Sequence, residues 1–131
     1  MFHKKIADTL TSAGRKITIH TVENYMTALI ESFVFYRADR YDIKGKQYLK
    51  TGSKYYAADI GLRYCVLGSK RADEGHILEN IVYLELLRRN YEVYVGKAGS
   101  SEVDFIAINE EGESYYQVAY TVRDADGETL K

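Results

Sequence analysis

The sequence predicts a mixed α/β chain of the α+β kind. Apolar residues recur at helical spacing in two early segments and again in HILENIVYLELLRRN, residues 76–90. Runs rich in Tyr, Val and Ile that alternate with polar residues occur at residues 33–42 and in three segments after residue 90. The chain has no proline and ten glycines, so glycines and polar clusters are expected to end these elements.

Two short helices and a strand pair are expected first. A helix over residues 3–13 presents Ile6 and Leu10 on one face, and Gly14 suits its C-terminal cap. A second helix starts near residues 18–21, where Thr residues suit an N-terminal turn, and continues to about residue 32. The run FVFYRADRYD, residues 33–42, alternates as a strand, and the basic segment IKGKQYLKTG leads into a returning strand over residues 54–59.

A short helix over residues 60–68 then ends at Gly68 and carries the single Cys65, which we expect to be a small buried residue. The polar stretch SKRADEG follows, and we place a domain boundary there, dividing the chain into residues 1–68 and 69–131. In the next helix, residues 76–90, we expect Ile77, Ile81, Leu84 and Leu86 or Leu87 to face the core. The strands YEVYVGK, EVDFIAIN and SYYQVAYTV complete a meander, the last two joined by the turn NEEGES.

Composition places the chain among soluble globular proteins, with 46% hydrophobic and 28% charged residues. No stretch approaches the ~18 apolar residues of a membrane span, so we expect a cytoplasmic protein without membrane contact. The net charge of −1 is unevenly distributed. Residues 1–54 hold ten Lys/Arg and five Asp/Glu, whereas residues 55–131 hold eight and fourteen. A basic front half is typical of a domain that contacts an anionic partner such as DNA.

Two short helices followed by a basic hairpin form the plan of a winged helix-turn-helix, in which the second helix enters the major groove of DNA and the hairpin, or wing, contacts phosphates. The candidate nucleic-acid contacts are Arg15, Lys16, His20, Thr21 and Asn24 around the second helix, and Lys44, Lys46, Lys50 and Lys54 in the wing. Units of this shape also serve as protein-interaction platforms, so the pattern leaves DNA binding and scaffolding open.

An acidic group is expected on the meander. Because strand side chains alternate, Glu102 and Asp104 are expected on one face, and an antiparallel pairing brings Asp104 toward Gln117. Glu79 of the preceding helix completes a set of oxygen ligands suited to Mg²⁺ or Mn²⁺, with Asp104 and Glu79 as the metal ligands. The same residues are also consistent with ordinary polar side chains on a half-exposed sheet.

The segments KYYAADIGLRYCVLG, GHILENIVYLELLRRNYEVYVGK, EVDFIA and YYQVAYTV resemble the C-terminal region of bacterial and archaeal AAA-type ATP-binding proteins. The resemblance covers nearly the whole chain and implies a winged helix joined to a partial restriction-endonuclease-like domain of the PD-(D/E)XK kind. It implies catalytic roles for Glu79, Asp104 and Gln117, and it places Ala119 where such sites carry a lysine. Loss of one such partner commonly lowers a rate by about two to three powers of ten. Lys97 is a candidate substitute, whereas Arg123 is too far along the strand.

Three functions therefore remain open. The chain is expected to be a C-terminal fragment of an AAA-type ATPase that binds DNA or a protein through a degenerate nuclease-like core. The alternatives are a weak Mg²⁺- or Mn²⁺-dependent DNase and a pure protein-interaction module. No GxxxxGK[ST] motif is present, so no ATP site is expected in this chain. The last expected strand, residues 114–122, lies at an open sheet edge, where pairing with a second copy would form a homodimer.

Overall fold

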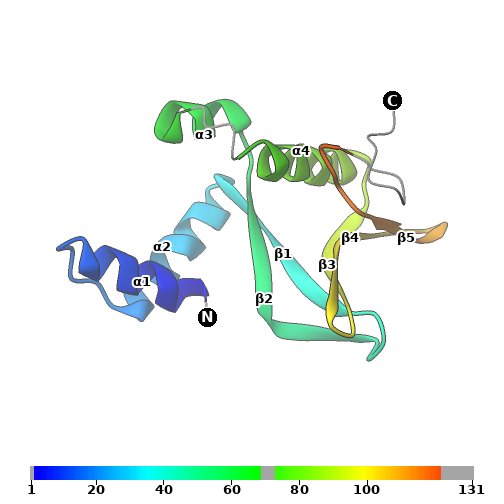
Figure 1. Ribbon diagram of the computed structural model, residues 1–131, viewed down its shortest axis with the longest axis horizontal. Helices are drawn as coiled ribbons and strands as arrows, with labels where there is room; N and C mark the ends of the chain where they lie inside the picture. Colours follow the sequence, from blue (N-terminus) through cyan, green and yellow to red (C-terminus); the bar gives the residue numbers. More distant parts are fainter. Residues whose placement is uncertain (1, 69–72, 122–131) are drawn as a thin grey trace.

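The computed structural model describes residues 2–68 and 73–121, and in this part of the chain it confirms a mixed α and β fold (Figure 1). The elements follow the expected order. They are α1 (Phe2–Ser12), α2 (Ile19–Glu31), β1 (Phe35–Asp42), β2 (Gln47–Ala57), α3 (Ile60–Leu67), α4 (Glu74–Arg88), β3 (Glu92–Ala98), β4 (Ser101–Asn109) and β5 (Gly112–Tyr116).

The strands described form one sheet with the order β2-β1-β3-β4-β5. Neighbouring strands pair antiparallel except β1 and β3, which run parallel, with Arg40 opposite Val95 and Tyr41 opposite Gly96. The expected wing, β1 and β2, is thus part of the same sheet as the meander. Strands from both sides of the expected boundary at residue 68 share this sheet, and residues 69–72 of the expected linker lie outside the described residues.

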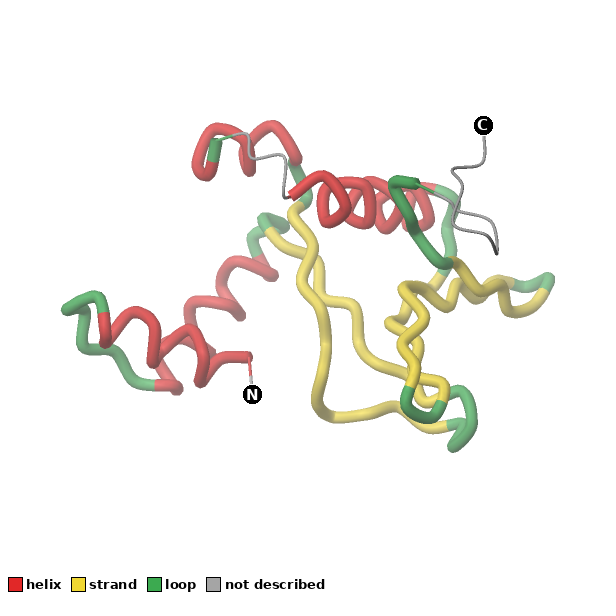
Figure 2. The backbone as a smooth tube through the Cα atoms, in the orientation of Figure 1, coloured by secondary structure: helices red, strands yellow, loops and turns green. Residues whose placement is uncertain are grey.

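Helix α4 covers one face of the sheet and forms the core with it (Figures 1 and 2). Its buried positions are Ile77, Asn80, Tyr83 and Leu86. The expectation that Ile81 faces the core is wrong, because this side chain is 47% exposed. Asn80 takes the inward position instead: its side-chain oxygen accepts from Ala57 N at 2.8 Å, and its amide donates to Ala57 O at 2.9 Å. A polar residue therefore anchors α4 to β2, which apolar periodicity cannot reveal.

Helices α1 and α2 form a pair beside the sheet (Figure 2). Thr18 is the N-terminal cap of α2 and accepts a hydrogen bond from Thr21 N, and Gly14 ends α1 with a φ of 83°. The pair meets the sheet where the ring of Phe2 stacks on Tyr55 at 4.7 Å. Helix α3 ends at Gly68 as expected. It has no buried residue, so the expectation of a buried Cys65 is wrong and the thiol is exposed.

Two bulges interrupt the strands. Between the pairs Ala38–Lys54 and Arg40–Leu49, residues 50–53 of β2 oppose the single residue Asp39 of β1. Gly52, with a φ of 86°, lies in this bulge, where a Cβ would come within 3.0 Å of the Arg40 guanidinium. Figure 1 shows β2 turning sharply along its length, as a bulge requires.

The second bulge lies in β4, where Asp104 and Phe105 together oppose Val95 of β3. The strict alternation expected for this strand is therefore wrong at Phe105. Asp104 and the fully buried Phe105 lie on the α4 side of the sheet. Val103 and Ile106 lie on the other side, where atoms of both come within 3.1 Å of a Cβ added at Gly96. Strand β5 lies at the edge of the sheet and ends at Tyr116, shorter than the segment 114–122 expected from sequence.

Candidate functional site

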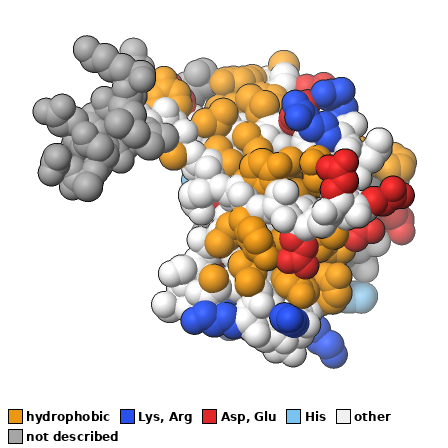
Figure 3. Space-filling model, turned by 90° about the vertical axis from the view of Figure 1, so that its right-hand side faces the viewer, with side chains coloured by type: hydrophobic (Ala, Val, Ile, Leu, Met, Phe, Trp, Pro, Cys, Tyr) orange, Lys and Arg blue, Asp and Glu red, His pale blue; other side chains and the backbone are white. Residues whose placement is uncertain are grey.

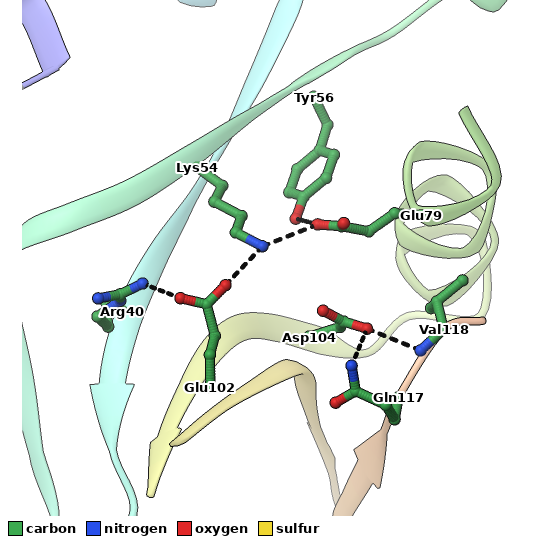
Figure 4. A network of polar contacts seen from close by, with 8 residues as sticks. All are labelled: Arg40, Lys54, Tyr56, Glu79, Glu102, Asp104, Gln117 and Val118. Carbon is green, nitrogen blue, oxygen red and sulfur yellow. Dashed lines mark hydrogen bonds and ion pairs between the residues drawn. The ribbon is translucent and has the colours of Figure 1, made fainter. Parts of the chain in front are cut away.

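The side chains predicted to form a site converge at one place, below α4 (Figure 4). Asp104 comes from the β4 bulge, Glu79 from α4, and Gln117 from the segment directly after β5. The amide of Gln117 donates to Asp104 Oδ2 at 2.7 Å, and the backbone N–H of Val118 donates to the same oxygen at 2.7 Å. The expected approach of Asp104 and Gln117 is therefore confirmed.

Lys54, expected in the wing, also belongs to this group. Its ammonium lies between two carboxylates, 3.1 Å from Glu79 Oε1 and 2.8 Å from Glu102 Oε1 (Figure 4). Arg40 pairs with the other oxygen of Glu102. The β2 bulge places Lys54 opposite Ala38, on the α4 side of the sheet. The two cations neutralise the two carboxylates, so this part of the site has no net charge.

The protonation states of the group follow from burial and charge. Burial alone lowers the pKa of Lys54, but hydrogen bonds to Glu102 and Glu79 outweigh it, and the pKa is raised above its ordinary value. Burial also raises the pKa of the Tyr56 hydroxyl, as do its 2.6 Å hydrogen bond to Glu79 and the charge of Asp104. Lys54 is thus charged and Tyr56 neutral across the physiological range.

Tyr56 connects this group to the core. Its ring stacks on Tyr83 of α4 at 4.3 Å between centroids and lies 5.6 Å from Phe105. Because Phe105 belongs to the same bulge as Asp104, the packing of the core fixes the position of the carboxylate. Lys54 and Tyr56 come from β2, so strands on both sides of the expected domain boundary build the site.

Glu79 and Asp104, the expected metal ligands, are both engaged by other groups of the protein. Within residues 2–68 and 73–121, no three His, Cys, Asp or Glu side chains are placed to hold a metal. Lys54 and Tyr56 bind Glu79 Oε1, and the amide nitrogen of Gln117 faces Asp104. One oxygen of each carboxylate, Glu79 Oε1 and Asp104 Oδ2, therefore already has partners within the protein.

The position expected for a lysine, Ala119, lies in an exposed segment outside any strand. Lys97 of β3 stands opposite Glu102 in the β3–β4 register, and Arg123 lies outside the described residues. The cation in contact with Glu79 is Lys54, 25 residues earlier in the chain. In the sequence, the only signal for it is a lysine opening the returning strand KYYAAD.

The candidate nucleic-acid contacts divide into two groups. Arg15 and Lys16 are exposed in the turn between α1 and α2, and His20 and Asn24 are exposed on α2. The backbone N–H of Thr21 donates to the hydroxyl oxygen of the cap residue Thr18, and the hydroxyls of these two residues lie 2.9 Å apart. These residues form one surface at the end of the helix pair.

Lys44 and Lys46 are exposed at the turn between β1 and β2, on the opposite side of the molecule from the α1–α2 turn (Figure 1). Lys50 belongs to neither place. It lines a hollow of about 660 Å³ between α1 and β2, together with His3 and Arg37. The structure thus does not bring Lys44 and Lys46 next to the start of α2.

Residues 3–73 match a family described as a domain of unknown function, DUF8612. The match covers more than half of the 131 residues. The chain belongs to this family. The DUF8612 segment includes Arg40 and Lys54, whereas Glu79, Asp104 and Gln117 lie beyond it.

Two longer relatives extend over nearly the whole chain. An uncharacterized protein of Haemophilus influenzae is 47% identical over 125 residues, which cover 95% of this chain and 31% of the relative. Uncharacterized protein MJ1544 of Methanocaldococcus jannaschii is 31% identical over 129 residues, covering 95% and 28% respectively. The chain thus spans less than a third of the length of these relatives. No solved structure gives a significant match.

Of the helices in the described ranges, none is both long enough and apolar enough to cross a membrane.

Proposed function

We propose that this chain is a DNA-binding domain with a nuclease-like core of little or no catalytic activity, from the C-terminal region of an AAA-type ATPase. The single observation that supports it best is Lys54 between Glu79 and Glu102. An uncompensated acidic cluster would repel phosphates, whereas Lys54 and Arg40 compensate two of its three carboxylates, Glu79 and Glu102. The ATPase context rests on the resemblance of the sequence, and the longer relatives leave room for a further module.

The proposed winged helix consists of α1, α2 and the β1–β2 hairpin. In it, α2 offers His20 and Asn24 to DNA, and Arg15 and Lys16 contact phosphates beside it. Lys44 and Lys46 form a separate basic tip at the turn between β1 and β2, away from the α1–α2 turn (Figure 1). The proposal therefore does not require one short duplex to contact both the basic tip and the α2 surface. The proposed nuclease-like core consists of α4 and the β3–β5 meander.

Two charge-reversal pairs test DNA binding. Arg15→Glu with Lys16→Glu is expected to weaken binding to a labelled duplex, and to reduce its salt dependence, because two phosphate contacts are lost. Lys4→Glu with Lys5→Glu, exposed on α1, is the matched control with the same change in net charge. Equal loss of affinity in the two pairs would mean that charge alone, without a defined surface, drives binding.

The second candidate is a weak Mg²⁺- or Mn²⁺-dependent DNase, favoured by the convergence of Glu79, Asp104 and Gln117 (Figure 4). Incubation with supercoiled plasmid and either ion separates the candidates. We expect no nicking beyond that of an Asp104→Asn control, which keeps the shape of the side chain. Nicking by the native chain that the Asp104→Asn variant lacks would instead establish the enzyme.

A further inference from the structure

The side of the sheet opposite α4 carries a row of tyrosines, which we call the tyrosine face: Tyr41, Tyr48, Tyr94 and Tyr115. Tyr41 pairs with Tyr48 across β1 and β2, and Tyr94 and Tyr115 both stand opposite Ile106 of β4. The side chains of Tyr48 and Tyr115 are 62% and 52% exposed. Helix α1 meets the sheet elsewhere, at Tyr55 of β2.

Three of the four rings, those of Tyr41, Tyr48 and Tyr94, form one cluster rather than isolated side chains. Tyr48 lies 5.2 Å from both Tyr41 and Tyr94 between ring centroids, and Tyr41 lies 6.4 Å from Tyr94. Ile106, between the rows, is fully buried beneath them. Neighbouring tyrosines on a sheet, two of them exposed and two half-buried, are typical of an interaction surface.

The two ends of the tyrosine face carry opposite charges. Glu92 and Glu113 both stand opposite Ile108, one row beyond Tyr94 and Tyr115. Each accepts a hydrogen bond from its tyrosine, at 3.2 Å for Tyr94 and 2.8 Å for Tyr115. Glu110 and Glu111, in the turn between β4 and β5, add to this acidic end.

At the other end lie the turns between β1 and β2 and between β3 and β4. Lys44 and Lys46 are exposed there, and the ammonium of Lys44 lies over Gly99. Asp42 is also present, but its carboxylate is engaged by the backbone N–H groups of Lys44 and Gly45. Figure 3 shows apolar side chains on the β5 side of the molecule, with Lys and Arg along the lower edge, Asp and Glu toward the right, and a second group of Lys and Arg at the upper right.

We propose that the tyrosine face binds a second copy of this chain in a symmetric dimer. Two copies can pack face to face about a twofold axis that runs between the sheets, perpendicular to the strands. This operation reverses the strand direction, so the acidic end of each copy faces the basic end of the other. A twofold axis parallel to the strands would place like charges together. The charge pattern therefore selects one arrangement.

Single-stranded nucleic acid, which also stacks on aromatic rings, suits this surface less well. Glu92 and Glu113 are bonded to two of the four tyrosine hydroxyls and would repel phosphates that follow the bases. A standard stable interface buries about 1,200–2,000 Å² in total. Both charged ends must therefore join the tyrosines in the contact, and reversing the charge of either end should weaken the dimer.

Sedimentation velocity of the 131-residue chain over a range of concentrations tests this proposal. We expect a monomer–dimer equilibrium. Glu92→Lys with Glu113→Lys should weaken it roughly tenfold or more, and Lys44→Glu with Lys46→Glu should do the same. Combining all four changes should restore association, because the complementary ends are exchanged. Lys4→Glu with Lys5→Glu on α1 should leave it unchanged, and circular dichroism checks folding in each variant.

A native chain that stays monomeric at concentrations on the order of 1 mM would overturn the proposal. A dimer that tolerates both charge-reversed pairs and Tyr48→Ser would also overturn it, and would favour pairing through the edge strand β5. The proposal is independent of DNA binding: Glu92→Lys with Glu113→Lys should weaken the dimer without lowering affinity for a DNA duplex.

Discussion

Replacing Asn80 by Ala removes the polar anchor between α4 and β2. The Asn80 side chain is 6% exposed and makes two hydrogen bonds, at 2.8 and 2.9 Å, to the N–H and C=O of Ala57. Each bond contributes about 1 kcal/mol net, and a buried partner left unsatisfied costs about 1–3 kcal/mol. We therefore expect Asn80→Ala to lower the free energy of unfolding by about 2–4 kcal/mol.

Urea denaturation followed by both tyrosine fluorescence and far-ultraviolet circular dichroism measures this change. Because β1 pairs with β3, and Asn80 ties α4 to β2, we expect the front and back halves to unfold in one transition. The control Asn24→Ala, at an exposed position of α2, should cause little change. A loss below about 1 kcal/mol for Asn80→Ala, or two separated transitions in the native chain, would refute the reasoning.

Three further outcomes are expected. Lys54→Met leaves Glu79 without its cation and should lower the free energy of unfolding by about 1–3 kcal/mol in urea titrations; an unchanged midpoint would contradict the role of this ion pair. Gly96→Ala places a methyl group 3.0 Å from the Cβ of Val103 and should destabilise by about 1–3 kcal/mol, whereas Gly75→Ala, with open space on α4, should be neutral or stabilising in the same thermal melts. Burial raises the pKa of the Tyr83 hydroxyl from 10 to about 12. The stability that comes from burying the neutral hydroxyl is therefore complete below pH 10 and is lost as the pH rises toward 12. The fall in the free energy of unfolding above pH 10 should be shallower in Tyr83→Phe.

Much of the fold could be predicted because local signals determined it. Gly14 and Gly68 end helices as expected, and the antiparallel pairing of β4 and β5 brings Asp104 to Gln117. The inward face of α4 was predicted less well. Periodicity selected Ile81, but the hydrogen bonds of Asn80 to Ala57 turn a polar residue inward.

The rest depended on contacts between distant residues. The parallel pairing of β1 with β3 has no local pattern, because its partners, such as Arg40 and Val95, lie far apart in the chain. The two bulges are also invisible in the alternation of apolar residues, although they decide the site. One places Phe105 on the same side as Asp104, and the other separates Lys54 from the basic tip of the hairpin.

The parallel seam between β1 and β3 has a consequence for how the chain folds. Both hairpins, β1–β2 and β3–β4–β5, close through short turns and can form early, whereas Tyr41 must meet Gly96 across a long stretch of intervening sequence. During synthesis, β1 and β2 leave the ribosome well before β3, with one strand edge still unpaired. Closing this seam should therefore limit the rate of folding, and the tyrosine-rich hairpin is the segment most prone to aggregate before it closes.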